Sequence, residues 1–221
     1  MGEAPLLNGK RLGLVRQAII DWFDRYGRDF PWRHGSEPFQ ILVAEMLLRR
    51  TTATAVSRIY TEFINRFDSL ERLARARQST IERSLSTVGL QSVRAQQLQQ
   101  MAKMVLKEYD GIIPENLAAL ESLSGVGRYA AAAVMNFAFG FPEAMVDGNV
   151  VHLMNRVFSL GVKGPTDNTI WDFMRKFGGP QDKRLYWGII DLVTIVCLRR
   201  VPFCHECPLS KYCDFYASNP K

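Results

Sequence analysis

The chain has 221 residues, 47% of them hydrophobic and 23% charged, a composition typical of a soluble globular protein that can bury a sizeable core. Its net charge of +6 favours polyanionic partners without identifying one. The longest apolar stretch, residues 130–141, contains Asn136 and is too short to cross a bilayer, so we expect no contact with a membrane. The N-terminus does not resemble an export signal, and we expect an intracellular protein.

Helical periodicity dominates the sequence, and no pair of alternating strands is evident. Apolar residues recur on one stripe from Gly9 to Arg25, which predicts an amphipathic helix. Further helices are expected at residues 39–48, from a threonine cap at 51–52 to 67, and at 69–75, 80–88, 92–109, just after Pro114, 169–177 and 184–196. The pattern predicts an all-α fold in two helical lobes, one of residues 30–140 and one of residues 1–29 plus 141–221.

A helix-hairpin-helix motif is predicted where Leu120 to Ala130 read as a short helix, a turn with Gly125 and Gly127, and an alanine-rich helix. Glycines let a backbone approach a phosphate closely, and the free amides of the second helix point at the anion. Such a hairpin grips a DNA backbone without reading its sequence. A plain connection between two helices is the alternative.

Asp147 follows the apolar pair Met145 and Val146 and precedes a helix that we expect Asn149 to cap. A carboxylate at that place is kept ionised by the helix dipole while it lies against an apolar wall. Two interpretations stay open for Asp147, a catalytic carboxylate or a mere capping residue.

All four cysteines of the chain lie near its C-terminus, spaced as Cys197-x6-Cys204-x2-Cys207-x5-Cys213. In a reducing compartment, thiols so close together are better explained as metal ligands than as two disulfides.

The hairpin, the Val-Asp-Gly-Asn-Val segment around Asp147 and the cysteine spacing, in this order, resemble the helix-hairpin-helix DNA glycosylase superfamily that includes endonuclease III and MutY. The resemblance spans Pro31 to Cys213. It implies a 4Fe-4S cluster on the four cysteines, with a structural zinc site as the alternative. It also implies a cleft between a barrel-like lobe with the hairpin and a lobe with the cluster, and possible binding of a monovalent cation by the hairpin carbonyls near Leu123, Gly125 and Val126.

The resemblance also assigns catalytic roles. Asp147 matches the catalytic aspartate, whose anion stabilises an oxocarbenium-like sugar after the target base has flipped out of the duplex. Bifunctional members carry a lysine where this chain has Tyr129, so the resemblance implies hydrolysis by water without lyase activity. Tyr129 is expected to contact the flipped nucleotide, with core packing as the alternative.

The target base is indicated by the segment from Phe39 to Thr52. Glu45 matches a glutamate that protonates the purine in MutY enzymes, yet Arg49 and Arg50 stand where those enzymes have glutamines. That pattern resembles the Mig-type thymine and uracil mismatch glycosylases most closely. Glu45 is expected to contact the flipped base or to be a buried anion paired with an arginine.

The residues expected to contact DNA fall into three groups. Arg50, with Arg49 beside it, would fill the gap left by a flipped pyrimidine, because a planar guanidinium can stack and donate. Phosphate contact or solvent exposure is the alternative for both. A second wedge would come from Leu90 and Gln91, and the hairpin contacts would come from Gly125, Gly127 and Arg128.

The sequence therefore predicts a monofunctional glycosylase of base excision repair, acting as a cytoplasmic, nucleoid-associated monomer on double-stranded DNA that contains a mismatch. The expected targets are thymine and uracil opposite guanine. The rival reading is an adenine glycosylase acting opposite guanine or its oxidised form, and a non-catalytic DNA-binding or redox-sensing protein is the answer from a different class.

Overall fold

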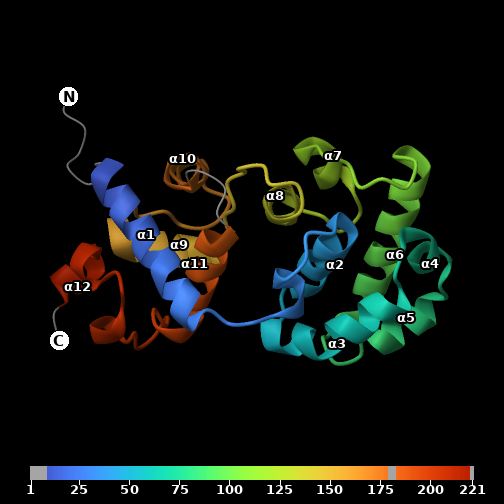
Figure 1. The fold of residues 1–221 in the computed structure, drawn as a ribbon, viewed down its shortest axis with the longest axis horizontal. Helices are drawn as coiled ribbons and strands as arrows, with labels where there is room; N and C mark the ends of the chain where they lie inside the picture. Colours follow the sequence, from blue (N-terminus) through green and yellow to red (C-terminus); the bar gives the residue numbers. More distant parts are fainter. Residues whose placement is uncertain (1–8, 179–182, 220–221) are drawn as a thin grey trace. The chain divides into compact units, whose positions relative to one another are not determined.

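The computed structural model describes residues 9–178 and 183–219, and these ranges contain helices and no β-strand (Figure 1), as the sequence predicts. By their internal contacts the residues group into two units, 29–141 and 1–28 together with 142–221. The helices are α1 (Gly9–Tyr26), α2 (Pro38–Leu48), α3 (Ala53–Arg66), α4 (Leu70–Arg75), α5 (Gln78–Ser84), α6 (Gln91–Glu108), α7 (Leu117–Ser122), α8 (Arg128–Phe137), α9 (Gly148–Phe158), α10 (Asn168–Phe177), α11 (Lys183–Ile195) and α12 (Asp214–Ser218), with short 3-10 helices η2 (Pro31–Arg33), η3 (Cys204–Glu206) and η4 (Ser210–Tyr212).

The unit of residues 29–141 is built on two almost fully buried helices. Residues 41–47 of α2 and residues 130–137 of α8 are buried, which explains why both segments are apolar apart from Glu45 and Asn136. The two helices pack against each other, α7 packs on α8, and α6 packs on α4 and α5 (Figure 1). This core therefore fixes the ends of α2, α6 and α8.

Side-chain caps start three helices of this unit. The hydroxyl of Thr52 accepts a hydrogen bond from the Ala55 amide, and the hydroxyl of Ser69 accepts one from the Arg72 amide. Asn116 caps α7, so that helix begins at Leu117 rather than beside Pro114.

The helix expected over residues 80–88 is shorter and lies earlier, because α5 ends at Ser84. Beyond it, the Leu85 amide donates to the Glu82 carbonyl at 3.0 Å and the Val88 amide donates to the Leu85 carbonyl at 3.1 Å. These bonds span three residues instead of four, so tight turns replace the helix. The segment then reaches Gly89 and α6 as a compact loop.

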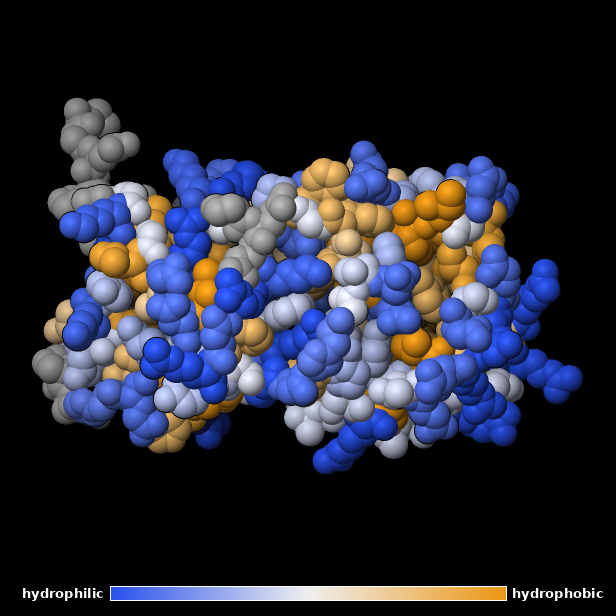
Figure 2. Space-filling view, in the orientation of Figure 1, coloured by the Kyte–Doolittle hydropathy of each residue, from blue (hydrophilic) through white to orange (hydrophobic). Residues whose placement is uncertain are grey.

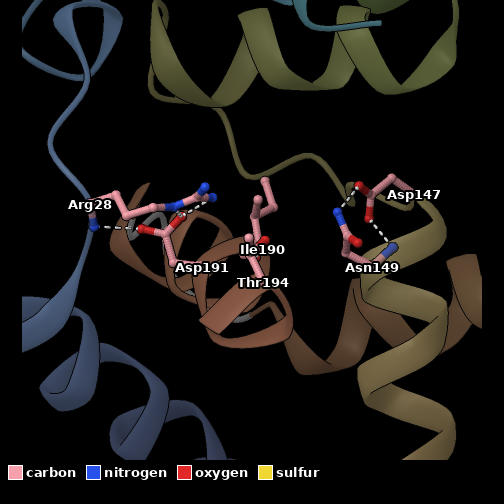
Figure 3. A network of polar contacts seen from close by, with 6 residues as sticks. All are labelled: Arg28, Asp147, Asn149, Ile190, Asp191 and Thr194. Carbon is pink, nitrogen blue, oxygen red and sulfur yellow. Dashed lines mark hydrogen bonds and ion pairs between the residues drawn. The ribbon is translucent and has the colours of Figure 1, made fainter. Parts of the chain in front are cut away.

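The unit of residues 1–28 and 142–221 joins the two ends of the chain. Helix α1 packs on α11 so closely that a Cβ atom added to Gly188 would lie 2.7 Å from Cγ2 of Ile19. Where α1 ends, Nε and Nη2 of Arg28 donate to Oδ1 of the fully buried Asp191 at 2.9 and 2.7 Å (Figure 3). The Arg28 amide also donates to Oδ2 of Asp191 at 2.7 Å, so both carboxylate oxygens are satisfied.

No helix among the described residues is long and apolar enough to cross a membrane. On the face drawn in Figure 2, hydrophobic residues appear between hydrophilic ones.

Candidate functional site

Asp147 is the N-cap of α9, which begins at Gly148 (Figure 3). Oδ1 of Asp147 accepts hydrogen bonds from the amides of Asn149 and Val150, both at 2.8 Å, and Oδ2 accepts one from Nδ2 of Asn149 at 3.0 Å. The prediction that Asn149 caps this helix is wrong, because Asn149 lies inside the first turn and its side chain bonds back to Asp147. Asp147 is thus a capping residue, which leaves a catalytic role open.

Opposing effects act on the pKa of Asp147. Burial raises the pKa of its carboxyl group, while the hydrogen bonds from Val150 and Asn149 and the charge of Arg199 act in the opposite direction. Asp167 is the half-buried N-cap of α10 with the same local bond to the amide two residues on, yet its pKa is lowered, chiefly by hydrogen bonds from Thr169, and burial is only a smaller, opposing cause. A cap carboxylate alone therefore does not produce the environment of Asp147.

Two arginines connect α9 to the cysteine segment. Nη2 of Arg199 donates to the Gly148 carbonyl at 3.1 Å and approaches Oδ1 of Asn149 at 3.5 Å. Arg156 belongs to α9 and donates to the carbonyls of Leu198 and Arg199 at 2.8 and 3.0 Å. The sequence does not predict this bridge, because nothing in the spacing of Arg199 from Gly148 reveals the contact.

The four cysteines line one cavity. Nη1 of Arg156 donates to Sγ of Cys197 at 3.4 Å. Burial, with a smaller contribution from Cys197, Cys213 and Cys204, raises the pKa of Cys207 to about 12. Four thiolates in this place would repel one another and would be stable only beside a cationic centre. Within residues 9–178 and 183–219, no three His, Cys, Asp or Glu side chains are close enough to share a single metal ion.

The predicted hairpin is formed by α7, a turn and α8. Gly125 has a φ of +77°, which glycine adopts freely, and a Cβ atom at this position would lie 2.9 Å from Cβ of Gln97. Gly127 has an extended backbone and ends the turn as the N-cap of α8. The next residue, Arg128, is exposed and Tyr129 is half-buried. The turn therefore needs glycine at residue 125 for both conformation and space.

Arg49 is held by the hairpin. Its Nη1 donates to the Gly125 carbonyl at 2.6 Å, so a side chain from the end of α2 lies on the hairpin turn. That carbonyl is one of those expected to hold a monovalent cation. A cation there would share the Gly125 oxygen with Arg49 or displace the guanidinium.

The predicted wedge residues lie at two turns with left-handed backbones. Arg50 and Leu90 both have a φ of +52°, which is rare for residues other than glycine. Both side chains are exposed, Leu90 by 54%, and Gln91 is the exposed first residue of α6.

Glu45 is buried in α2, with only 7% of its surface exposed. Burial raises the pKa of Tyr60, and the nearby Glu45 carboxylate raises it further by a smaller amount. The hydroxyl of Tyr60 donates to the Gln40 carbonyl at 3.0 Å. Glu45 thus lies beside a tyrosine, a neighbour that the sequence did not predict.

The candidate residues gather in separate units. Asp147 lies with the cysteines in one, while Glu45, the two exposed turns and the hairpin lie in the unit of residues 29–141.

Comparisons with known proteins agree on one family. The model of the HhH-GPD superfamily base excision DNA repair proteins matches residues 43–177. A thymine/uracil-DNA glycosylase of Methanothermobacter thermautotrophicus is 38% identical over 213 residues, which cover 95% of this chain and 96% of that protein. The solved structure of a thermostable thymine-DNA glycosylase matches with a TM-score of 0.89 at 36% identity and covers 95% of this chain and 98% of that one.

An adenine DNA glycosylase of Buchnera aphidicola is more distant, at 26% identity over 206 residues that cover 92% of this chain and 58% of that protein. The matched family model spans more than half of the chain, and the similarity to the thymine/uracil-DNA glycosylase extends over nearly all of both proteins. The chain belongs to the HhH-GPD superfamily of base excision DNA repair proteins.

Proposed function

We propose that this protein is a monofunctional DNA glycosylase that removes thymine or uracil mispaired with guanine. The observation that carries the proposal is the Asp147 carboxylate, partly buried and held by three hydrogen-bond donors at the start of α9. The two similar glycosylases named for thymine support the choice of base, and the adenine enzyme is more distant.

The reaction breaks the bond between C1′ of the sugar and the base nitrogen. The base leaves with the bonding electrons and gains a proton, while a water molecule adds its oxygen to C1′ and loses a proton. Positive charge develops on the sugar as the base leaves, and a fixed anion that need not reorganise stabilises it. Asp147 supplies that anion, and Asn149 and the α9 amides keep it in place.

Tyr129 determines the nature of the products in this account. A lysine at this position would supply an amine that forms a Schiff base with the sugar, whereas a phenol does not. Water is then the nucleophile, and the product is an abasic site in an intact strand.

The target base must first leave the duplex before its sugar can meet Asp147, and this step also belongs to the proposal. Arg50, Leu90 and Gln91 fill the gap that the base leaves, since all three are exposed at the two turns beside α6. Gly125, Gly127 and Arg128 hold the phosphate backbone, with Arg49 bound to the hairpin turn. Glu45 contacts the flipped base.

The four cysteines hold a 4Fe-4S cluster in this proposal. One thiolate binds each iron, and the cluster supplies the positive charge that lets four thiolates lie together. The assignment is supported by the cavity that all four cysteines line. Arg156 donates to Cys197 and would neutralise part of the charge of the thiolates.

Single-turnover assays on duplexes with G:T, G:U and A:G mispairs, each with and without an alkali step, test the proposal. A matched G:C duplex is the control. We expect strand breaks at the thymine or uracil only after alkali. Removal of adenine would overturn the choice of base, and breaks without alkali would overturn the role given to Tyr129.

A further inference from the structure

Arg94, in the first turn of α6, is one of the few buried charged residues, with 5% of its surface exposed. Among the described residues, its guanidinium donates only to backbone carbonyls. Nη1 donates to Met46 and Leu47 at 2.9 and 3.0 Å, Nη2 donates to Arg49, and Nε donates to Gly89 at 3.0 Å. One side chain thus connects the end of α2 to the turn before α6.

These carbonyls have a physical need for a cation. The last carbonyls of a helix have no partner within the helix and carry the negative end of its dipole. Helix α2 ends at Leu48, and its buried end cannot obtain hydrogen bonds from water. The guanidinium supplies the missing donors in a planar fork, and the four carbonyls offset the cost of burying its charge.

The same contacts hold two strained turns. Arg50 and Leu90 have a φ of +52°, a conformation that is unfavourable for residues other than glycine and persists only where the surroundings fix it. The Arg49 carbonyl precedes Arg50 directly, and the Gly89 carbonyl precedes Leu90 directly. In addition, the Arg94 amide donates to the Leu90 carbonyl at 2.9 Å.

We propose that Arg94 is a positioning residue that couples the turn of residues 49–51 to the turn of residues 89–91. Because the two turns are held together, Arg50 and Leu90 contact DNA in a fixed arrangement. The step from coupled turns to DNA rests on the proposed function. The coupling itself does not, since it follows from hydrogen bonds within one unit. The ammonium group of a lysine could not reach both turns at once, because it is a point charge without the guanidinium fork.

Amide hydrogen exchange tests the coupling without any DNA. In Arg94→Lys we expect faster exchange at both turns together, while the first turn of α10, in the other unit, keeps its rate. Arg11→Lys is the matched control, since Arg11 also bridges distant carbonyls, those of Val157 and Tyr212, in the other unit. Faster exchange at one turn alone, or at neither, would overturn the proposal.

A second measurement uses only the wild-type protein, so it does not depend on whether Arg94→Lys folds. If Arg94 couples the turns, the amides at the two turns open in one event, with the same dependence on denaturant. Separate opening events would contradict the coupling.

A double-mutant cycle tests the role in base extrusion, measured by the fluorescence of 2-aminopurine placed next to a G:T mispair. We expect Arg94→Lys to lower extrusion about tenfold in the wild-type background. When Arg50→Ala and Leu90→Ala are already present, the same substitution should lower extrusion by less than about twofold, because the effects of substitutions within one network are not additive. An equal loss in both backgrounds would mean that Arg94 only stabilises the fold, and the proposal would fail. Coupled turns in a protein that releases no base would instead refute the proposed function and support the coupling.

Discussion

Replacing Asp147 with asparagine should separate catalysis from folding. Asparagine keeps one oxygen for the amides of Asn149 and Val150, but its NH₂ group would face the Asn149 donor that Oδ2 now accepts at 3.0 Å. The lost hydrogen bond costs about 1 kcal/mol of unfolding free energy.

The ionisation of Asp147 works in the other direction. Its pKa is raised in the folded protein, chiefly by burial, so the stability that its carboxyl group contributes is present below the unfolded pKa and is lost as pH rises through the folded value. At neutral pH the wild-type anion carries this penalty and the asparagine does not. The two effects oppose, and we expect the unfolding free energy to change by no more than about 1 kcal/mol.

Activity should respond far more strongly than stability. Removing a preorganised group that stabilises charge in the transition state costs about 10²–10³ in rate, or about 2.7–4 kcal/mol. The assay is single-turnover base removal from a G:U duplex, with binding to the same duplex measured in parallel and expected to persist.

Asp167→Asn is the matched control, because Asp167 caps α10 through the same local bond but has a lowered pKa. This variant should keep the wild-type rate. The reasoning would be refuted if Asp147→Asn retained the wild-type rate, or if its loss of rate simply followed a loss of folded protein.

Four other outcomes follow from the same structure. Acidification should slow base removal at a pH above the usual range of an aspartate, because the pKa of Asp147 is raised and the reaction needs its anion; a pH profile of the single-turnover rate checks this. Gly125→Ala should lower the unfolding free energy by at least about 1–2 kcal/mol, because φ is +77° there and the new Cβ would lie 2.9 Å from Gln97, whereas Gly127→Ala meets nothing within 4 Å and should change thermal unfolding little. The purified protein should be brown, and Cys213→Ser should lose visible absorption and iron; a colourless wild-type protein with one zinc ion would contradict the cluster. Tyr129→Lys should give a covalent complex with DNA that borohydride traps, and the wild-type protein should give none.

Much of the helical framework could be predicted from local patterns. The apolar stripe from Gly9 to Arg25 matches α1 to within one residue at its end, and a threonine cap before the helix that ends near Phe67 was expected where Thr52 caps α3. These features depend on periodicity and on groups a few residues apart, which a sequence displays directly.

Features that depend on long-range contacts could not be predicted. The short α5 reflects tight turns after Ser84 that no breaker residue announces. Arg49 donates a hydrogen bond to the Gly125 carbonyl, and Arg94 donates one to the Met46 carbonyl, 48 residues away. Neither hydrogen bond has a local signal in the sequence. Asp147 lies between these cases, since its type and place suggested a carboxylate site, while its hydrogen bonds and burial required the fold.

Product analysis of a G:T duplex tests the central claim most directly. The duplex is incubated with excess enzyme, and the released material and the intact strand are identified by mass. The account predicts free thymine together with an unbroken strand that carries one abasic sugar with a hydroxyl at C1′. Thymine that stays attached to its strand, or a strand already cleaved at that position, would contradict it.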